Sequence, residues 1–254
     1  MIILLSPSKT LDFKSASPTS ITSQPVFAKE AAELIRHLKK LSVSELEDMM
    51  RISTKLAWLN QKRFALWKPE FTIANSSQAI YSFKGEVYHG LDVESMQIGN
   101  VENSQQHLRI LSGLYGVLRP LDLIQPYRLE MGTSFHFGKY ADLYHFWRQK
   151  TTRQIGIDLK ESGSNLLINL ASQEYFSAID SKKLKAEIIT PQFLNSKNGA
   201  FKMITVYAKK ARGMMARYIL DYHINCEEYL RGFDSEGYCF NSNLSKPGSP
   251  VFTR

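Results

Sequence analysis

Cysteine is scarce in this 254-residue chain, which contains only Cys226 and Cys239, thirteen positions apart. Such a pair is neither a CxxC motif nor a disulfide framework, and no neighbouring residue marks either thiol as activated. This scarcity excludes the small disulfide-stapled domains and disfavours a peroxide-sensing cysteine pair. It favours a reducing, cytoplasmic compartment.

Long hydrophobic runs are also absent. The opening segment "MIILLSP" has no basic residues before its five apolar ones. It is too short for a signal peptide or a membrane span, which need at least about 7 and about 18 apolar residues respectively. We therefore expect no membrane association and interpret this segment as a buried first strand.

Paired metal-ligand spacing is the third absence. The six histidines are His37, His89, His107, His136, His145 and His223. No two of them stand at the i, i+4 spacing that places two imidazoles on one helix face, and the thiols are isolated. The sequence therefore predicts no metal site and no resident cofactor, and it disfavours direct iron chelation.

Positive charge, by contrast, is abundant. The chain has 32 Lys and Arg against 24 Asp and Glu, a formal net charge of +8. Such an excess favours an anionic partner, either a nucleic acid or a phosphorylated small molecule. Six of the positive residues fall in the segment 197–217, which contains no Asp or Glu. Lys209, Lys210 and Arg212 are expected in the first turn of a helix, where free N–H groups favour an anion. The alternative is a solvated basic face.

The periodicity of apolar residues predicts a mixed α+β chain. The first expected helix covers "VFAKEAAELIRHLKK", with Ala31, Leu34, Ile35 and Leu38 buried, and the second begins at the capping box of Ser42 and Glu45. The third covers Ser53–Trp67, with Leu56, Leu59, Phe64 and Trp67 as its apolar positions. Further helices are expected over "SQQHLRIL", "YADLYHFWRQKTTRQI" and "KKARGMMARYILDYH". Strands are expected at "NLLINLAS", "KAEIITPQF", "FKMITVYA", "GYCF" and "PVFT", with a tight hairpin turn at Asn198-Gly199. Because no linker is richer than the polar loop Ser15–Gln24, we expect a single domain over residues 1–254.

Two carboxylates stand out near the basic stretches. Glu130 follows Arg128 in "YRLEMG", and Glu174 follows a predicted buried strand in "SQEYF". If both met the basic cluster in one cleft, general acid–base chemistry would be possible. The alternative is that Arg128 and Glu130 form a structural ion pair.

The stretch "LRILSGLYGVLRP" resembles the outline of a helix-hairpin-helix, a device that binds DNA phosphates through the N–H groups of its turn. Gly113 and Gly116 would form the turn, and Arg109 and Arg119 would flank the phosphate. The two glycines are three positions apart instead of the usual two, and Pro120 and Pro126 shorten the second helix. The alternative is a turn that uses glycine for a positive φ.

Several long motifs carry a resemblance to a known family. They are "SPSKTLDF", "RISTKLA", "FKGEVYHGL", "LSGLYGVLRPLDLIQPYRLEMG", "NLASQEYF", "YAKKARGMMARYI" and "GFDSEGY". In this order, over nearly the whole chain, they resemble the YaaA family of bacterial peroxide stress proteins. The resemblance implies a cytoplasmic protein that limits hydrogen peroxide damage and is associated with lowered intracellular free iron. It also implies a compact α+β fold of unusual topology, with a mixed sheet, flanking helices and a helix-hairpin-helix beside a basic cleft that binds DNA.

Carried over residue by residue, the hairpin corresponds to Leu111–Leu118. The basic cleft corresponds to Lys9, Lys84, Arg128, Lys209, Lys210 and Arg212.

Two functions remain open on this reading. The first is a sequence-indifferent DNA binder, taking double-stranded DNA or DNA with unpaired bases. Tyr88, Tyr115, Tyr127 and Tyr207 could stack on such bases or belong to the core. The second is an enzyme acting on a nucleotide-like or other phosphorylated ligand, clamped by Lys and Arg, with Glu130 or Glu174 as base.

Overall fold

A five-stranded mixed sheet forms the centre of the protein in a computed structural model that describes residues 1–13 and 17–254. Its strands, in spatial order, are β6 (Gly116–Leu118), β5 (Leu108–Ser112), β1 (Ile2–Leu5), β8 (Leu166–Asn169) and β9 (Glu187–Ile189). β5, β1, β8 and β9 run parallel, whereas β6 is antiparallel to β5. Every residue of β1 is buried, as predicted for the opening segment. Such continuous apolar strands are typical of parallel sheets covered on both faces.

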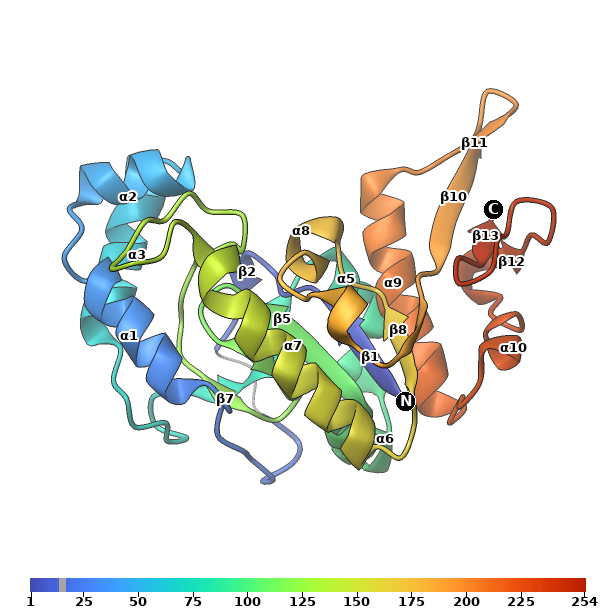
Figure 1. The fold of residues 1–254 in the computed structure, drawn as a ribbon, viewed down its shortest axis with the longest axis horizontal. Coiled ribbons are helices and arrows are strands. Elements are labelled where there is room, and N and C mark those ends of the chain that lie inside the picture. Colours follow the sequence, from blue (N-terminus) through green and yellow to red (C-terminus); the bar gives the residue numbers. More distant parts are fainter. Residues whose placement is uncertain (14–16) are drawn as a thin grey trace.

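Helices cover this sheet on both sides. Figure 1 shows α7 (Leu143–Glu161) in front of the strands, with α5 (Glu86–Leu91) and α6 (Ile98–His107) behind them and α9 (Thr205–Asp221) at the right. The helix and strand predictions for α7, α9 and β8 are confirmed. The expected α+β class is confirmed as well. The predicted strand "FKMITVYA" is wrong over its second half, because β11 (Ala200–Lys202) ends at Lys202 and Thr205–Ala208 form the first turn of α9.

A second group of helices stands at one end of the sheet. It consists of α1 (Ala28–Leu38), α2 (Val43–Met50) and α3 (Thr54–Leu66). The four predicted apolar positions of α1 are all buried. The predicted capping box is present, because the Ser42 backbone N–H donates to Glu45 Oε2 at 2.7 Å and the Glu45 N–H donates to Ser42 Oγ at 3.3 Å.

The predicted buried face of α3 is partly wrong. Leu56 and Leu59 are 36% and 43% exposed, while Ala57, Asn60 and Phe64 face the core. The buried polar Asn60 donates from Nδ2 to the Leu56 carbonyl at 2.7 Å and accepts from Arg63 at 3.3 Å. The packing of α3 against α1 and α2 determines which face is buried, and the positions of the leucines alone do not predict that face.

A smaller four-stranded sheet lies beyond α9. Its order is β11 (Ala200–Lys202), β10 (Gln192–Lys197), β13 (Val251–Thr253) and β12 (Cys239–Phe240). Asn198 and Gly199 form the turn between β10 and β11 with φ of 54° and 75°, which confirms the predicted hairpin. In Figure 1 this hairpin projects from the upper right of the molecule.

Short elements complete the fold. They are β2 (Thr10–Leu11) paired with β4 (Phe83–Lys84), β3 (Ser77–Gln78) paired with β7 (Leu123–Ile124), the helices α4 (Ala79–Ser82), α8 (Gln173–Phe176) and α10 (Glu227–Leu230), and three single 3-10 turns at Val93–Ser95, Ser181–Lys183 and Ser235–Gly237.

The predicted helix-hairpin-helix is wrong, and the predicted helix over "SQQHLRIL" is half right, because Ser104–His107 belong to α6 and Leu108–Leu111 to β5. α6 ends at His107, and the chain continues directly into β5, which forms an antiparallel hairpin with β6. The backbone N–H groups of Leu114 and Tyr115 in its turn both donate to Ser112 Oγ, at 3.2 and 3.0 Å. The whole turn is buried, so these N–H groups cannot meet phosphate. A short apolar run fits a buried strand as well as a helix, and the neighbouring strand β1 decided between them.

The crossing of α5 and α9 depends on two glycines. A Cβ on Gly213 would overlap with the Val87 carbonyl oxygen of α5, and a Cβ on Gly90 would overlap with the Lys210 carbonyl oxygen of α9. Neither backbone can retreat without separating the helices. Glycine therefore allows the two helices to pack backbone against backbone.

Gly213→Ala is expected to destabilise the protein by about 3 kcal/mol, because the added methyl group must push α5 away from α9. Urea unfolding followed by circular dichroism measures this loss. Gly156→Ala in α7 is the matched control, since the nearest atom to its added Cβ is Leu184 Cδ2 at 3.8 Å. There the change should stabilise the helix by up to about 1 kcal/mol. Equal effects at the two positions would contradict the proposed packing.

Candidate functional site

Several polar loops lie together at the carboxyl ends of the central parallel strands. The loop after β1 and the loop after β8 meet here, because the Ser172 backbone N–H donates to Ser6 Oγ at 2.8 Å. The Tyr88 hydroxyl of α5 donates to the Ser6 carbonyl at 3.1 Å. β1 lies between β5 and β8, so the connections of the sheet diverge at this point. In open parallel sheets, ligands bind at such a divergence, outside the carboxyl ends of the strands.

Three cations and a carboxylate form a cluster at this edge, called here the carboxyl-edge cluster: Lys9, Arg63, Arg128 and Glu130. Glu130 shares its oxygens between Lys9 Nζ at 2.5 Å and Arg128 Nη2 at 3.2 Å. Burial, and next the positive charge of Arg128, lower the pKa of Arg63 in α3. Arg63 therefore stands near enough to Arg128 for the two charges to repel. The cluster joins α3 and two loops that lie far apart in the sequence.

Arg128 is the least satisfied member of this cluster. Its side chain is 17% exposed, and its buried Nε has no hydrogen-bond partner among residues 1–13 and 17–254. A buried donor without an acceptor is costly, and functional sites are where such costs are most often retained. An anion that reached this Nε would relieve the cost by accepting its hydrogen bond.

The second candidate carboxylate, Glu174, lies on the neighbouring loop. Its Oε1 accepts from the Gly132 backbone N–H at 3.0 Å, and a Cβ on Gly132 would stand 3.3 Å from the same oxygen. Burial raises the pKa of Tyr175, and the negative charges of Glu174 and Glu130 raise it further. Both candidate carboxylates therefore lie near the Tyr175 phenol. The structure brings them into one region.

Lys84 also reaches this region, through the pairing of β2 with β4. Thr10, which follows Lys9, stands opposite Lys84, and a Cβ on Gly85 would stand 2.9 Å from Ser8 Oγ. The ammonium of Lys84 is already paired with Glu94 at 2.7 Å. Its charge is therefore partly neutralised in this state.

The cations of α9 differ from one another. Lys209 is exposed and forms no ion pair with the described residues, whereas Lys210 pairs with Glu236. Burial lowers the pKa of Arg212, for which the described part of the chain supplies no ion-pair partner. α9 begins at Thr205, so all three lie beyond its first turn. The predicted helix-start anion site is therefore wrong, although the cations themselves remain candidates.

Four predicted phosphate ligands have structural roles. Arg109 is 5% exposed, and its Nε donates to the buried Asp158 at 2.8 Å. Arg119 pairs with the buried Asp122 at 3.2 Å. The carbonyl of Gly113 accepts from Trp147 Nε1 at 2.8 Å, and a Cβ on Gly116 would stand 2.6 Å from the Trp147 ring. Burial keeps Arg109, Gly113 and Gly116 from phosphate, which corrects the prediction for these three. Arg119 is 35% exposed, so its pairing with Asp122 leaves it a candidate.

The predicted base-stacking tyrosines are mostly core residues. Tyr88, Tyr115 and Tyr127 are buried, and burial raises the pKa of each. Tyr207 is 43% exposed, with the Arg254 guanidinium 4.9 Å from the centre of its ring. Stacking on a base is thus open to Tyr207 alone among these four.

Sequence reasoning missed Arg63. It lies in α3, about 65 residues before Arg128 in the chain, and no local pattern marks it. The motif "RISTKLA" just before it, part of the family resemblance, was the nearest signal.

Residues 1–13 and 17–254 contain no cluster of three or more His, Cys, Asp or Glu side chains that could hold a metal ion. Within the same ranges, no helix has both the length and the apolar character needed to cross a bilayer.

A protein-family model matches most of the chain. The model described as peroxide stress protein YaaA matches residues 1–244 of the chain. This range includes every member of the carboxyl-edge cluster and all of α9. The match confirms the resemblance carried by the sequence motifs, and the chain belongs to the YaaA family of peroxide stress proteins.

Proposed function

We propose that this peroxide stress protein binds DNA through its phosphate backbone at the carboxyl-edge cluster. The observation that carries the proposal is the meeting of Lys9 and Arg128 on Glu130 at the edge where parallel sheets bind ligands. Arg63 adds a third cation, whose pKa the charge of Arg128 lowers. Phosphate contacts of this kind fix a duplex in place without reading its bases. We also expect lowered intracellular free iron to accompany this action, as the family resemblance implies.

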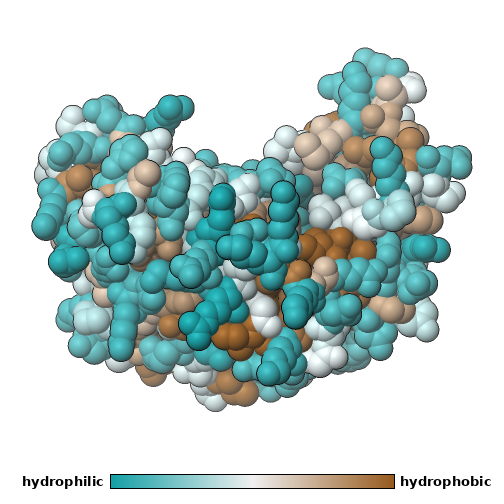
Figure 2. Space-filling model, in the orientation of Figure 1, coloured by the Kyte–Doolittle hydropathy of each residue, from teal (hydrophilic) through white to brown (hydrophobic). Residues whose placement is uncertain are grey.

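The shape of the molecule favours a large ligand such as a DNA duplex. Figure 2 shows a hollow between two raised lobes, which are the group of α2 and α3 and the projecting β10–β11 hairpin of Figure 1. α8 lies between these lobes, just after Ser172 in the chain. Lys197 and Lys202 on the hairpin, and Lys209 on α9, are exposed. A duplex lying in the hollow would meet positive charge from the floor and from the hairpin side.

The salt dependence of binding tests the proposal. Six phosphate contacts give a slope of about −5 in a plot of log affinity against log salt concentration. Fluorescence anisotropy of a labelled duplex of arbitrary sequence, titrated at several salt concentrations, measures this slope. Affinity that does not change with salt, or no binding at low salt, would end the proposal.

The alternative function is an enzyme that acts on a nucleotide or another phosphorylated substrate. It is favoured by the position of Glu130 and Glu174 near Tyr175 at the carboxyl edge of the sheet. Lys9 and Arg128 would hold the phosphate and one of the two carboxylates would take the proton.

Glu130→Gln separates the two functions. In a DNA binder the change removes a negative charge beside the phosphates, and affinity should rise about fivefold, equivalent to about 1 kcal/mol for one close charge pair in water. In an enzyme with Glu130 as base, the same change should abolish turnover of the substrate. Anisotropy with a labelled duplex, and product analysis with a panel of nucleotides and nicked DNA, give the two readings. Weaker DNA binding by Glu130→Gln would contradict the first.

A further inference from the structure

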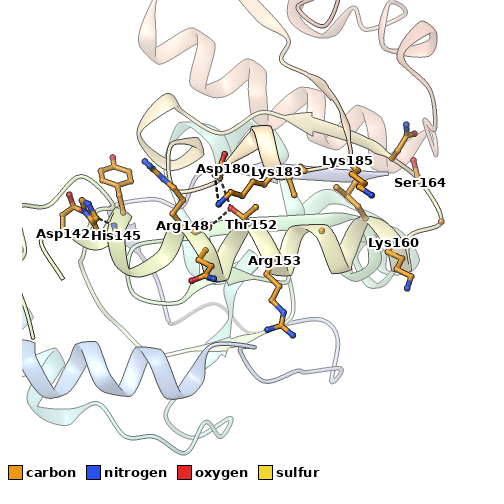
Figure 3. Close-up of a pocket in the computed structure, with 17 residues that line it drawn as sticks. Asp142, His145, Arg148, Thr152, Arg153, Lys160, Ser164, Asp180, Lys183 and Lys185 are labelled. Carbon is orange, nitrogen blue, oxygen red and sulfur yellow. Dashed lines mark hydrogen bonds and ion pairs between the residues drawn. The ribbon is translucent and has the colours of Figure 1, made fainter. Parts of the chain in front are cut away.

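A long groove runs along the outer side of α7, and one end of it adjoins the loop of Glu174. Figure 3 shows it between α7 and the segment 180–185, with Lys160 and Lys185 toward one end and Arg148 and His145 toward the other. Its volume is about 1230 Å³. Known small-molecule sites span about 300–1,000 Å³, so this groove suits an elongated ligand. None of the residues that the sequence predicted as functional lines it.

The groove carries an excess of positive charge. Its lysine and arginine residues are Arg148, Arg153, Lys160, Lys183 and Lys185. Arg153, Lys160 and Lys185 are exposed and form no ion pair in the part of the chain that the structure describes. These three charges are therefore available to an anion.

The two aspartates of the groove are already engaged. Asp142 caps α7 by accepting from the His145 backbone N–H at 2.8 Å. Burial alone would raise the pKa of Asp142, but the hydrogen bonds from His145 outweigh it and lower that pKa. Asp180 pairs with Lys183 at 3.6 Å. Neither carboxylate faces the three free cations as a partner.

Gly156 supplies a second, independent observation. It lies in the interior of α7, where glycine costs roughly 1 kcal/mol relative to alanine. Packing does not require it, because an added Cβ would meet one atom of the described residues, Leu184 Cδ2, at an ordinary 3.8 Å. This contrasts with Gly90 and Gly213, which backbone atoms press upon. The lack of a side chain at position 156 instead keeps the floor of the groove open.

We propose that the α7 groove binds a linear oligophosphate, a chain of phosphoanhydride-linked phosphates. Arg148 and Lys160 are twelve residues apart in α7, which is about 18 Å at 1.5 Å per residue. A ligand that engages both ends must therefore carry negative charge along an extended chain.

The groove offers little to a nucleic acid base. Its tyrosine, Tyr144, is half-buried, and its hydroxyl donates to the Glu174 carbonyl at 3.0 Å. Single-stranded nucleic acids are usually held by exposed aromatic rings as well as by cations. The other ring in the lining, His145, is exposed, but its Nδ1 lies 2.8 Å from Asp142 Oδ1. The groove thus offers cations along its length and little ring surface, and none of its lining residues belongs to the carboxyl-edge cluster.

The test uses the full chain and isothermal titration calorimetry with inorganic pyrophosphate and a medium-chain inorganic polyphosphate. The longer chain should bind at least about tenfold more tightly, because it engages both ends of the groove in one molecule. Lys160→Ser with Lys185→Ser should weaken polyphosphate binding about tenfold or more and leave pyrophosphate little changed. The matched control, Lys40→Ser with Lys246→Ser, removes two exposed lysines outside the groove and should keep wild-type affinity.

Gly156→Leu tests the floor of the groove without changing any charge. The larger side chain should fill the space beside Leu184 and weaken polyphosphate binding about tenfold, with unchanged affinity for duplex DNA. Gly156→Ala should retain most of the binding, which shows that loss is steric. Wild-type affinity in Gly156→Leu would overturn the proposal. So would equal or tighter binding of oligothymidine at the same phosphate concentration, because the groove would then be a nucleic-acid surface.

Discussion

Lys9→Glu combined with Lys209→Glu is expected to weaken duplex DNA binding about 100-fold at low salt. Each substitution removes a positive charge near phosphate and adds a negative one. Each of these two changes weakens the binding free energy by about 0.7 kcal/mol in a hydrated interface. Two positions together amount to about 3 kcal/mol, which is a factor of about 100. Both side chains are exposed, so folding should be unaffected.

Competition and salt titrations with a labelled duplex measure this loss. The slope of log affinity against log salt should become shallower by about 2, because two phosphate contacts disappear. The control, Lys29→Glu with Lys160→Glu, makes the same change in net charge near the ends of α1 and α7 that lie away from the hollow of Figure 2. If control and test variants lose affinity equally, binding follows net charge and the carboxyl-edge cluster is not the site.

Arg109→Met is expected to destabilise the protein by about 4 kcal/mol. Asp158 is 4% exposed, and the loss of Arg109 would leave its carboxylate buried without its cation. Arg109 Nη1 also donates to the carbonyls of Gln105 and Leu108, at 2.9 and 2.8 Å, so the change frees two further acceptors. Urea unfolding at neutral pH measures the free energy of unfolding.

The double variant Arg109→Met with Asp158→Leu separates charge from packing. With both ions removed, most of the lost stability should return, since well-packed apolar residues replace buried ion pairs at little cost. The folded Arg109→Met variant should bind duplex DNA like the wild type, because the Arg109 side chain is buried in the protein core beside β5. A loss of DNA affinity without a loss of stability would restore Arg109 as a phosphate ligand.

Several parts of the fold could be predicted because local rules decide them. The amphipathic pattern of α1, the capping box at Ser42 and the Asn198-Gly199 turn each depend on residues within a few positions of one another. β5 could not be predicted in this way, because its apolar run fits a helix and a buried strand equally well. Pairing with β1, about a hundred residues earlier, settled the matter.

The candidate site, too, was predictable only where local sequence decides the outcome. The sequence by itself determined the excess of cations, the α+β class and the family to which the chain belongs. Only the tertiary structure decided which cations meet. It buried Arg109 against Asp158 and assembled Lys9, Arg63 and Arg128 from three distant segments. The physical reason is that a charge acts on whatever lies within a few ångströms of it, and the order of residues along the chain does not fix those neighbours.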